Sequence, residues 1–121
     1  MRVNTLSAST LDGNDVKNPQ GEHLGHIKDI MINLHDGSVA YAVLSFGGFL
    51  GLGDKLFAIP WSSIRVDQQN KCCVLDISKE RLENAPGFDK DRWPKAGDTT
   101  YLTKVYEYYK AKPFWAEPET V

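Results

Sequence analysis

Short apolar runs alternate with polar turn residues over the first two thirds of the chain. Runs of this length, bounded by glycine, proline, asparagine and aspartate, are typical of β-strands. Strands at such short and regular intervals indicate a small β-sandwich or β-barrel. The pattern predicts extended segments at residues 15–17, 24–34, 39–46, 56–59 with a continuation to 67, and 72–77.

The longest predicted strand, residues 24–34, changes the phase of its alternation. Ile27 belongs to one face, whereas the apolar residues from Ile30 onward belong to the other. A β-bulge near Lys28 would reconcile the two faces, and bulges are common where a sheet bends to close. Together with a glycine-rich corner and a proline at a strand end, Pro60, this favours a closed antiparallel β-barrel of five or six strands.

Asp36 and Gly37 lie between two apolar strands and predict a hairpin with a two-residue turn, because glycine accepts a positive φ. The return strand, residues 39–46, is apolar on both faces, which is typical of a strand covered on both sides. We therefore expect a further layer on the outside of the sheet, and the C-terminal segment is the natural candidate.

The last third of the chain is helical and irregular in pattern. Ser78 fits the cap of a short helix over residues 79–84, and a second helix is expected from residue 98 or 99 to about 110. Leu102, Val105, Tyr106 and Tyr109 form one stripe of that helix at helical spacing. We expect a β-barrel domain at residues 1–80, a helical, aromatic-rich extension packed on it at 81–121, and a loose tail after residue 113.

Composition narrows the function classes. The 121 residues suit one domain. Fourteen basic and sixteen acidic residues give a net charge of −2, which argues against nonspecific binding to nucleic acid. Apolar runs fall short of the ~20 residues that span a bilayer, and the start lacks the apolar region of a signal peptide. We expect a soluble cytoplasmic protein.

The residues that could carry chemistry do not form a pattern. Cys72 and Cys73 are adjacent, so a disulfide between them would be strained, and we expect one in the core and one facing outward. His23 and His26 would lie on opposite faces of a strand, and His35 lies in a turn. The carboxylates are scattered over turns and strand ends. The sequence therefore predicts no catalytic residue, metal site or cofactor, and a protein that is not an enzyme.

The glycine-rich connection at residues 47–53 resembles a phosphate loop only superficially. It lacks the full glycine pattern and is followed by a strand rather than a helix. Its apolar side chains, Phe49, Leu50 and Leu52, fit either a structural corner or a protein-contact loop. Both interpretations stay open from the sequence.

The aromatic residues concentrate near the C-terminus. Eight of the thirteen fall between Phe88 and Trp115. Binding of single-stranded nucleic acid by stacking also needs a positively charged surface, but residues 79–121 carry eight basic and eight acidic side chains and so have no net charge. Most of this segment should pack on the barrel exterior. Tyrosine and tryptophan are also enriched at interfaces, and the candidate contact residues are Trp61, Trp93, Tyr106 and Tyr109.

Several runs resemble the PRC-barrel domain family. They are DVKN at 15–18, GEHLGHIKDI at 21–30, DGSVAYAVL at 36–44, GGFLGLG at 47–53 and FAIPW at 57–61. The resemblance covers about residues 5–80, and the tail looks like the extension of stand-alone bacterial members. It implies a small β-barrel used as an interaction module, with no shared catalytic residues to carry over.

Three functions stay open at this point. The first is a non-catalytic adaptor that binds another protein or a second copy of itself. The second is a barrel that binds a small ligand or cofactor in a crevice against the extension, lined by Trp61, Trp93 and Tyr41. The third, by analogy with ribosome-associated relatives, is an accessory role in RNA or ribosome metabolism, although the near-neutral charge disfavours direct contact with RNA.

Overall fold

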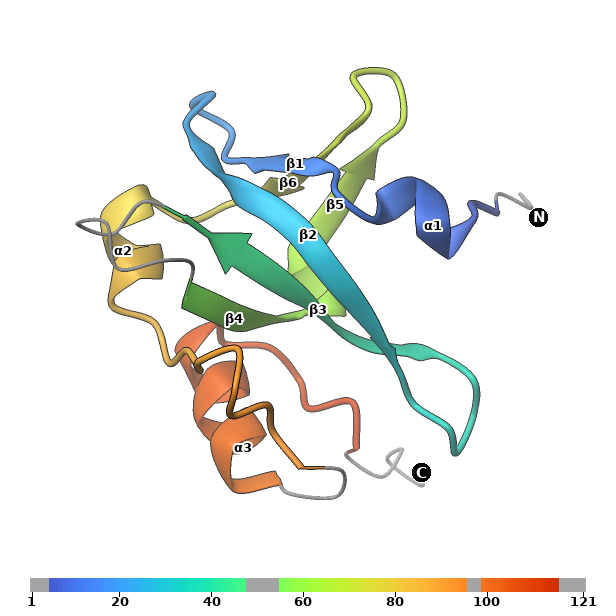
Figure 1. The fold of residues 1–121 in the computed structure, drawn as a ribbon, viewed down its shortest axis with the longest axis vertical. Helices are drawn as coiled ribbons and strands as arrows, with labels where there is room; N and C mark the ends of the chain where they lie inside the picture. The colour runs from blue at the N-terminus through green and yellow to red at the C-terminus, as the bar shows by residue number, and fades with distance from the viewer. Residues whose placement is uncertain (1–4, 48–54, 96–98, 116–121) are drawn as a thin grey trace, which may run out of the picture.

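The computed structural model describes residues 5–47, 55–95 and 99–115. Over these residues the chain forms six strands, three α-helices and one 3₁₀ turn (Figure 1). In chain order they are α1 (Ala8–Leu11), β1 (Asp15–Lys17), β2 (His23–Ile32), β3 (Val39–Phe46), β4 (Lys55–Pro60), η1 (Trp61–Ser63), β5 (Ile64–Asp67), β6 (Cys72–Leu75), α2 (Lys79–Glu83) and α3 (Thr99–Tyr108).

The strands form one sheet in the order β4-β3-β2-β1-β6-β5. The sheet curls into a half-barrel (Figure 1), which confirms the predicted small, mainly β fold with a helical C-terminal extension. Four of the five strand pairs are antiparallel, and the β1–β6 pair, where Val16 lies opposite Cys73, is parallel. The two edge strands, β4 and β5, follow each other in the chain and are joined by η1.

The predicted bulge in β2 is confirmed. The register between β2 and β3 shifts between Ile27 and Asp29, and a second shift follows between Met31 and Ile32. Because a bulge bends its strand and increases the local twist, these two shifts let β2 leave the barrel wall and run on into the β2–β3 hairpin.

The hairpin turn is wider than predicted. The Asn33 N–H donates to the Ser38 carbonyl and the Gly37 N–H donates to the Asn33 carbonyl, both at 2.8 Å, so the loop comprises residues 34–37. The prediction of a two-residue turn was wrong because Asp36 stabilises the wider loop. Its carboxylate accepts the Ser38 N–H at 3.0 Å and the Ser38 hydroxyl at 2.7 Å.

Two hydrophobic clusters lie on the two faces of the sheet, and β3 contributes to both. The inner core fills the half-barrel, and the outer core lies between the sheet and the C-terminal segment, as the two apolar faces of β3 predict. The inner core is Leu11, Val16, Leu24, Ile27, Ala42, Leu44, Phe46, Phe57, Ile59, Cys73, Leu75, Ile77, Leu82 and Ala85. The outer core is Ala40, Tyr41, Val43, Leu56, Ala58, Phe88, Leu102, Val105 and Tyr106.

Both cysteines are buried, which corrects the prediction that one faces outward. Cys73 belongs to the inner core, and Cys72 lies on the other face of β6 with only 8% of its surface exposed. The cysteine on the opposite face of β6 is therefore shielded from solvent rather than exposed. Burial raises the pKa of the Cys73 thiol, and the neighbouring Cys72 adds to the shift.

The C-terminal segment starts with the predicted helix α2, but its last described residues are not loose as predicted. The Ser78 hydroxyl caps α2 by accepting the Arg81 N–H at 3.1 Å. Helix α3 ends where Lys110 adopts a φ of +55°. The predicted loose tail is wrong up to Trp115, because the Trp115 ring lies 5.1 Å from that of Tyr106 in the outer core. The division of the chain at residue 80 stays a prediction.

Candidate functional site

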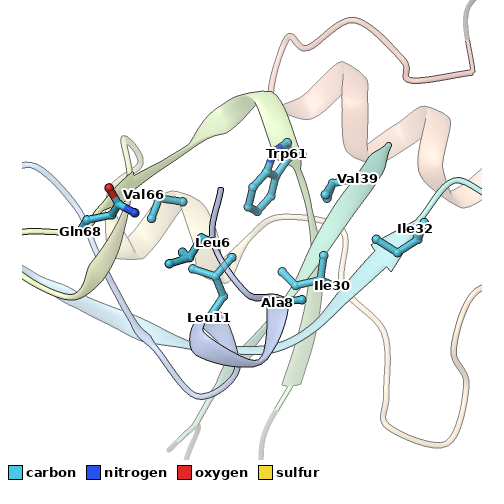
Figure 2. A pocket seen from close by; sticks show the side chains of 9 residues that line it. All are labelled: Leu6, Ala8, Leu11, Ile30, Ile32, Val39, Trp61, Val66 and Gln68. Carbon is cyan, nitrogen blue, oxygen red and sulfur yellow. The ribbon is translucent and has the colours of Figure 1, made fainter. Parts of the chain in front are cut away.

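An apolar cavity of about 300 Å³ opens between α1, the far half of β2, η1 and β5 (Figure 2). We call it the mouth groove. Among the described residues that line it, Gln68 is the one polar residue. The described lining residues are Leu6, Ala8, Leu11, Ile30, Ile32, Val39, Trp61, Val66 and Gln68.

The corner between β4 and β5 places Trp61 in the mouth groove. Pro60 pairs with Tyr41 at the end of the β4 ladder, and a proline ends such a ladder because it has no N–H to donate. The chain then makes the single turn η1 and enters β5. This turn directs the Trp61 indole toward the lining side chains of α1 and β2 (Figure 2).

The β2–β3 hairpin forms a second wall of the mouth groove. Ile30 and Ile32 are two residues apart, and Val39 lies opposite Ile32 in the ladder. Ile30 packs against the inner core, whereas 48% of the Ile32 surface is exposed. The apolar residues of the hairpin therefore continue beyond the part of β2 that packs against the inner core.

Helix α1 lies across one side of the groove and is fixed there by backbone hydrogen bonds. Leu11 is buried in the inner core. The segment after it is bonded to β2, since the Gly13 N–H donates to the Ile27 carbonyl at 2.8 Å and the Ile27 N–H donates to the Asn14 carbonyl at 2.9 Å. Leu6, two residues before the start of α1, lines the groove with 40% of its surface exposed.

Three large hydrophobic side chains are exposed among the residues that the structure describes: Leu6, Ile32 and Leu34. Two of them line the mouth groove, and Leu34 follows Ile32 by two residues in the hairpin loop, with 93% of its surface exposed. Scattered apolar residues are normal on a protein surface, whereas a contiguous set marks an interaction site.

A second cavity, of about 520 Å³, lies between the barrel and the extension. It corresponds to the crevice predicted for a small ligand, but only Trp61 of the three predicted residues lines it. Tyr41 instead packs against Phe114, with ring centroids 6.3 Å apart, and Trp93 packs against Phe88 at 5.3 Å. The lining is Asp36, Val39, Ala40, Trp61, Ser62, Tyr106, Lys112, Pro113 and Phe114.

The predicted contact residues lie in different places. Trp61 lines the mouth groove, whereas Tyr106 is buried and Trp93 and Tyr109 pack against the outer core. The loop residues Phe49, Leu50 and Leu52 lie outside the described residues. The interaction role of all seven stays a prediction.

Two residues of the groove, Leu6 and Ile32, were not predicted as site residues. A signal for Ile32 was present, because the apolar pattern of β2 continues to Leu34, close to the tip of its hairpin. The sequence contains no such signal for Leu6, because its place beside the groove depends on how the N-terminal segment packs against the rest of the fold.

Several titratable groups of the described residues have structural partners or lie in the cores. His23 lies 3.2 Å from the Asp15 carboxylate, and both side chains are more than half exposed. Within residues 5–47, 55–95 and 99–115, groups of three or more histidine, cysteine or acidic side chains suited to a metal ion are absent. Burial raises the pKa of Tyr101 to about 12 and also raises the pKa values of Tyr106 and Tyr109. These phenols therefore stay protonated at neutral pH.

Comparison with known proteins identifies the family of this chain. The model of the PRC-barrel domain family matches residues 4–82. This stretch contains all six strands and ends within α2, so α3 and the tail lie beyond it. No curated protein matches the chain. Within the part of the chain that the structure describes, no helix is long and apolar enough to cross a membrane.

Proposed function

Since this chain belongs to the PRC-barrel domain family, we propose that it is a non-catalytic protein-interaction module that docks its partner in the mouth groove. Membership of a fold family does not by itself define a function. The observation that supports the proposal is the apolar surface formed by the groove, which includes the exposed side chains of Leu6 and Ile32, with the exposed Leu34 two residues further along the hairpin.

The groove has the features of a docking site. Burying an exposed leucine or isoleucine side chain contributes about 1.5–3 kcal/mol, so covering Ile32 and its neighbours would supply a useful fraction of a binding free energy. Trp61 lies among these aliphatic side chains, and tryptophan is enriched among the residues that dominate binding energies. The backbone bonds of α1 and the β2–β3 ladder hold the groove walls, which lowers the entropic cost of binding.

The placement of the titratable side chains supports a non-catalytic role. Asp36 and Asp67 accept hydrogen bonds from residues of their own turns. Cys73 is buried with a raised pKa, the opposite of the environment that activates a thiol. The proposal keeps the cytoplasmic location that the sequence predicts.

A small apolar ligand is the second candidate for the mouth groove. Its volume of about 300 Å³ lies at the lower end of the range for small-molecule sites, which are also mostly apolar. A thermal-shift screen with apolar dyes, quinones and flavins tests this candidate. A ligand that raises the midpoint of unfolding for the natural chain and not for Ile32→Asp would support it.

An accessory role beside RNA is the third candidate, and it has the least support. The net charge of −2 supplies little of the counterion release that drives binding to RNA. A gel shift at low salt that shows no complex would remove it.

Site-specific photo-crosslinking tests the proposed docking role. A photoreactive residue is placed at Ile32 in one variant and at Gln20, an exposed turn residue outside the groove lining, in a matched control. We expect a protein that is crosslinked from position 32 and not from position 20. The purified partner should then bind the natural chain and the Gln20→Asp variant, and lose affinity for Ile32→Asp. Identical crosslinks from both positions would contradict the proposal.

A further inference from the structure

We infer that the mouth groove receives Leu34 of a second copy of this chain, in a weak and symmetric dimer. This inference rests on the proposed docking role of the groove and adds the identity of one occupant. It joins two features that the fold leaves side by side, an apolar side chain that projects and an apolar hollow that nothing in the described chain fills.

The projecting side chain is held in a defined place. Leu34 is 93% exposed, yet the loop that carries it is fixed on both sides by hydrogen bonds. The Asn33 N–H donates to the Ser38 carbonyl at 2.8 Å, and the His35 N–H donates to the Asn33 side-chain oxygen at 3.1 Å. A leucine presented on an ordered loop loses little backbone freedom when it is buried in an interface.

The hollow fits an aliphatic side chain. Its walls are the side chains of Ile30, Ile32, Val66 and Trp61, and a cavity of about 300 Å³ has room for a leucine. Buried aliphatic side chains gain free energy from leaving water and from close packing, without needing a hydrogen-bond partner.

The chain does not fill its own groove with Leu34, as the exposure of this side chain shows. Leu34 lies two residues beyond Ile32, which itself lines the groove, so the projection and the hollow are neighbours. A two-fold axis brings a surface against its own copy, and a contact from residue i to residue j is then made twice. Two hairpins that pack across such an axis can therefore exchange Leu34 side chains.

The size of the patch sets the expected strength. Stable complexes bury about 800 Å² on each partner, and three exposed aliphatic side chains with a small groove cover less than that. A net charge of −2 gives little repulsion between copies. We expect a reversible dimer with a dissociation constant in about the 10 µM to 1 mM range, the region of small transient interfaces.

Sedimentation of the full chain over a concentration series tests the inference. We expect the mass to move from one chain toward two as concentration rises. Leu34→Lys places a charge in the apolar contact and should keep the chain monomeric, without loss of stability because this side chain is exposed. Gln20→Lys adds the same charge outside the groove lining and should associate like the natural chain.

A charge-swap mixture tests the pairing itself. Ala8 is exposed and lines the hollow, so Ala8→Glu should also weaken self-association. An equimolar mixture of Leu34→Lys and Ala8→Glu restores one natural contact and joins the introduced lysine to the introduced glutamate. We expect the mixture to form heterodimers at concentrations where each variant alone is monomeric.

The outcomes separate this inference from the proposed function. A natural chain that stays monomeric at about 1 mM, or a dimer that survives both substitutions, overturns the Leu34 contact. If position 32 nevertheless crosslinks to a different protein, the docking role of the groove stands and only its occupant changes. If the chain neither associates through Leu34 nor forms a crosslink from position 32, the docking role of the groove is contradicted as well.

Discussion

The phenolic hydroxyl of Tyr106 on α3 donates a hydrogen bond of 2.7 Å to the backbone carbonyl of Ala40 on β3. The two residues are far apart in sequence, and both are buried in the outer core. Through this bond and the rings around it, the C-terminal segment occupies the outer face of the sheet. The mouth groove, on the other side of β3, is left as the uncovered apolar surface of the described chain.

We predict that Tyr106→Phe destabilises the protein by about 1–3 kcal/mol, because it leaves the buried Ala40 carbonyl without this partner. Urea unfolding followed by circular dichroism measures the change. A variant as stable as the natural chain would show that the bond contributes nothing to docking the extension.

Tyr109→Phe gives the matched contrast. The Tyr109 hydroxyl is buried without a hydrogen-bond partner among the described residues, so removing it should leave stability unchanged or raise it by up to about 1 kcal/mol. The same urea experiment measures both variants. If Tyr109→Phe loses as much stability as Tyr106→Phe, the hydroxyl contributes in a way that this account does not include.

Gly25 is predicted to tolerate no side chain. Its φ is +143°, and an added Cβ would collide with the backbone oxygen of Ser45 on β3. Gly25→Ala should destabilise the fold by about 3 kcal/mol or more, from strain and from displaced strand pairing. Gly21→Ala is the control, because its φ is also positive but the position is open, and it should cost only about 1 kcal/mol.

Alkaline pH should unfold the protein through its buried phenols. Burial raises the pKa of Tyr101 from 10.0 to about 12, and its hydroxyl donates to the Pro86 carbonyl. Because this pKa is higher in the folded than in the unfolded protein, the Tyr101 phenol ionises at a lower pH in the unfolded chain. Its contribution to the free energy of unfolding is therefore fully present below about pH 10 and is lost as the pH rises toward 12. Unfolding free energies measured over this range should fall less steeply for Tyr101→Phe. Equal slopes would show that Tyr101 titrates normally.

The sequence predicted features that depend on local pattern. The phase change between Ile27 and Ile30 located the bulge, because side chains alternate strictly along a regular strand. The two apolar faces of β3 predicted an outer layer, because an apolar face must be covered.

Other features depend on contacts that no local pattern encodes. The parallel pairing of Val16 with Cys73 joins segments that are distant in the sequence. The hairpin loop widened because the Asp36 side chain hydrogen-bonds to Ser38. The mouth groove arises where β2 extends beyond the half-barrel, which depends on how the whole sheet curls and not on any single segment.

The affinity of the crosslinked partner tests the docking role of the mouth groove most directly. Isothermal titration calorimetry would compare the natural chain, Ile32→Asp and Gln20→Asp, each with circular dichroism to show an intact fold. Losing one buried aliphatic side chain from the interface costs about 1.5–3 kcal/mol, so we predict at least about tenfold weaker binding for Ile32→Asp and no change for Gln20→Asp. Equal affinities for all three chains would contradict the account.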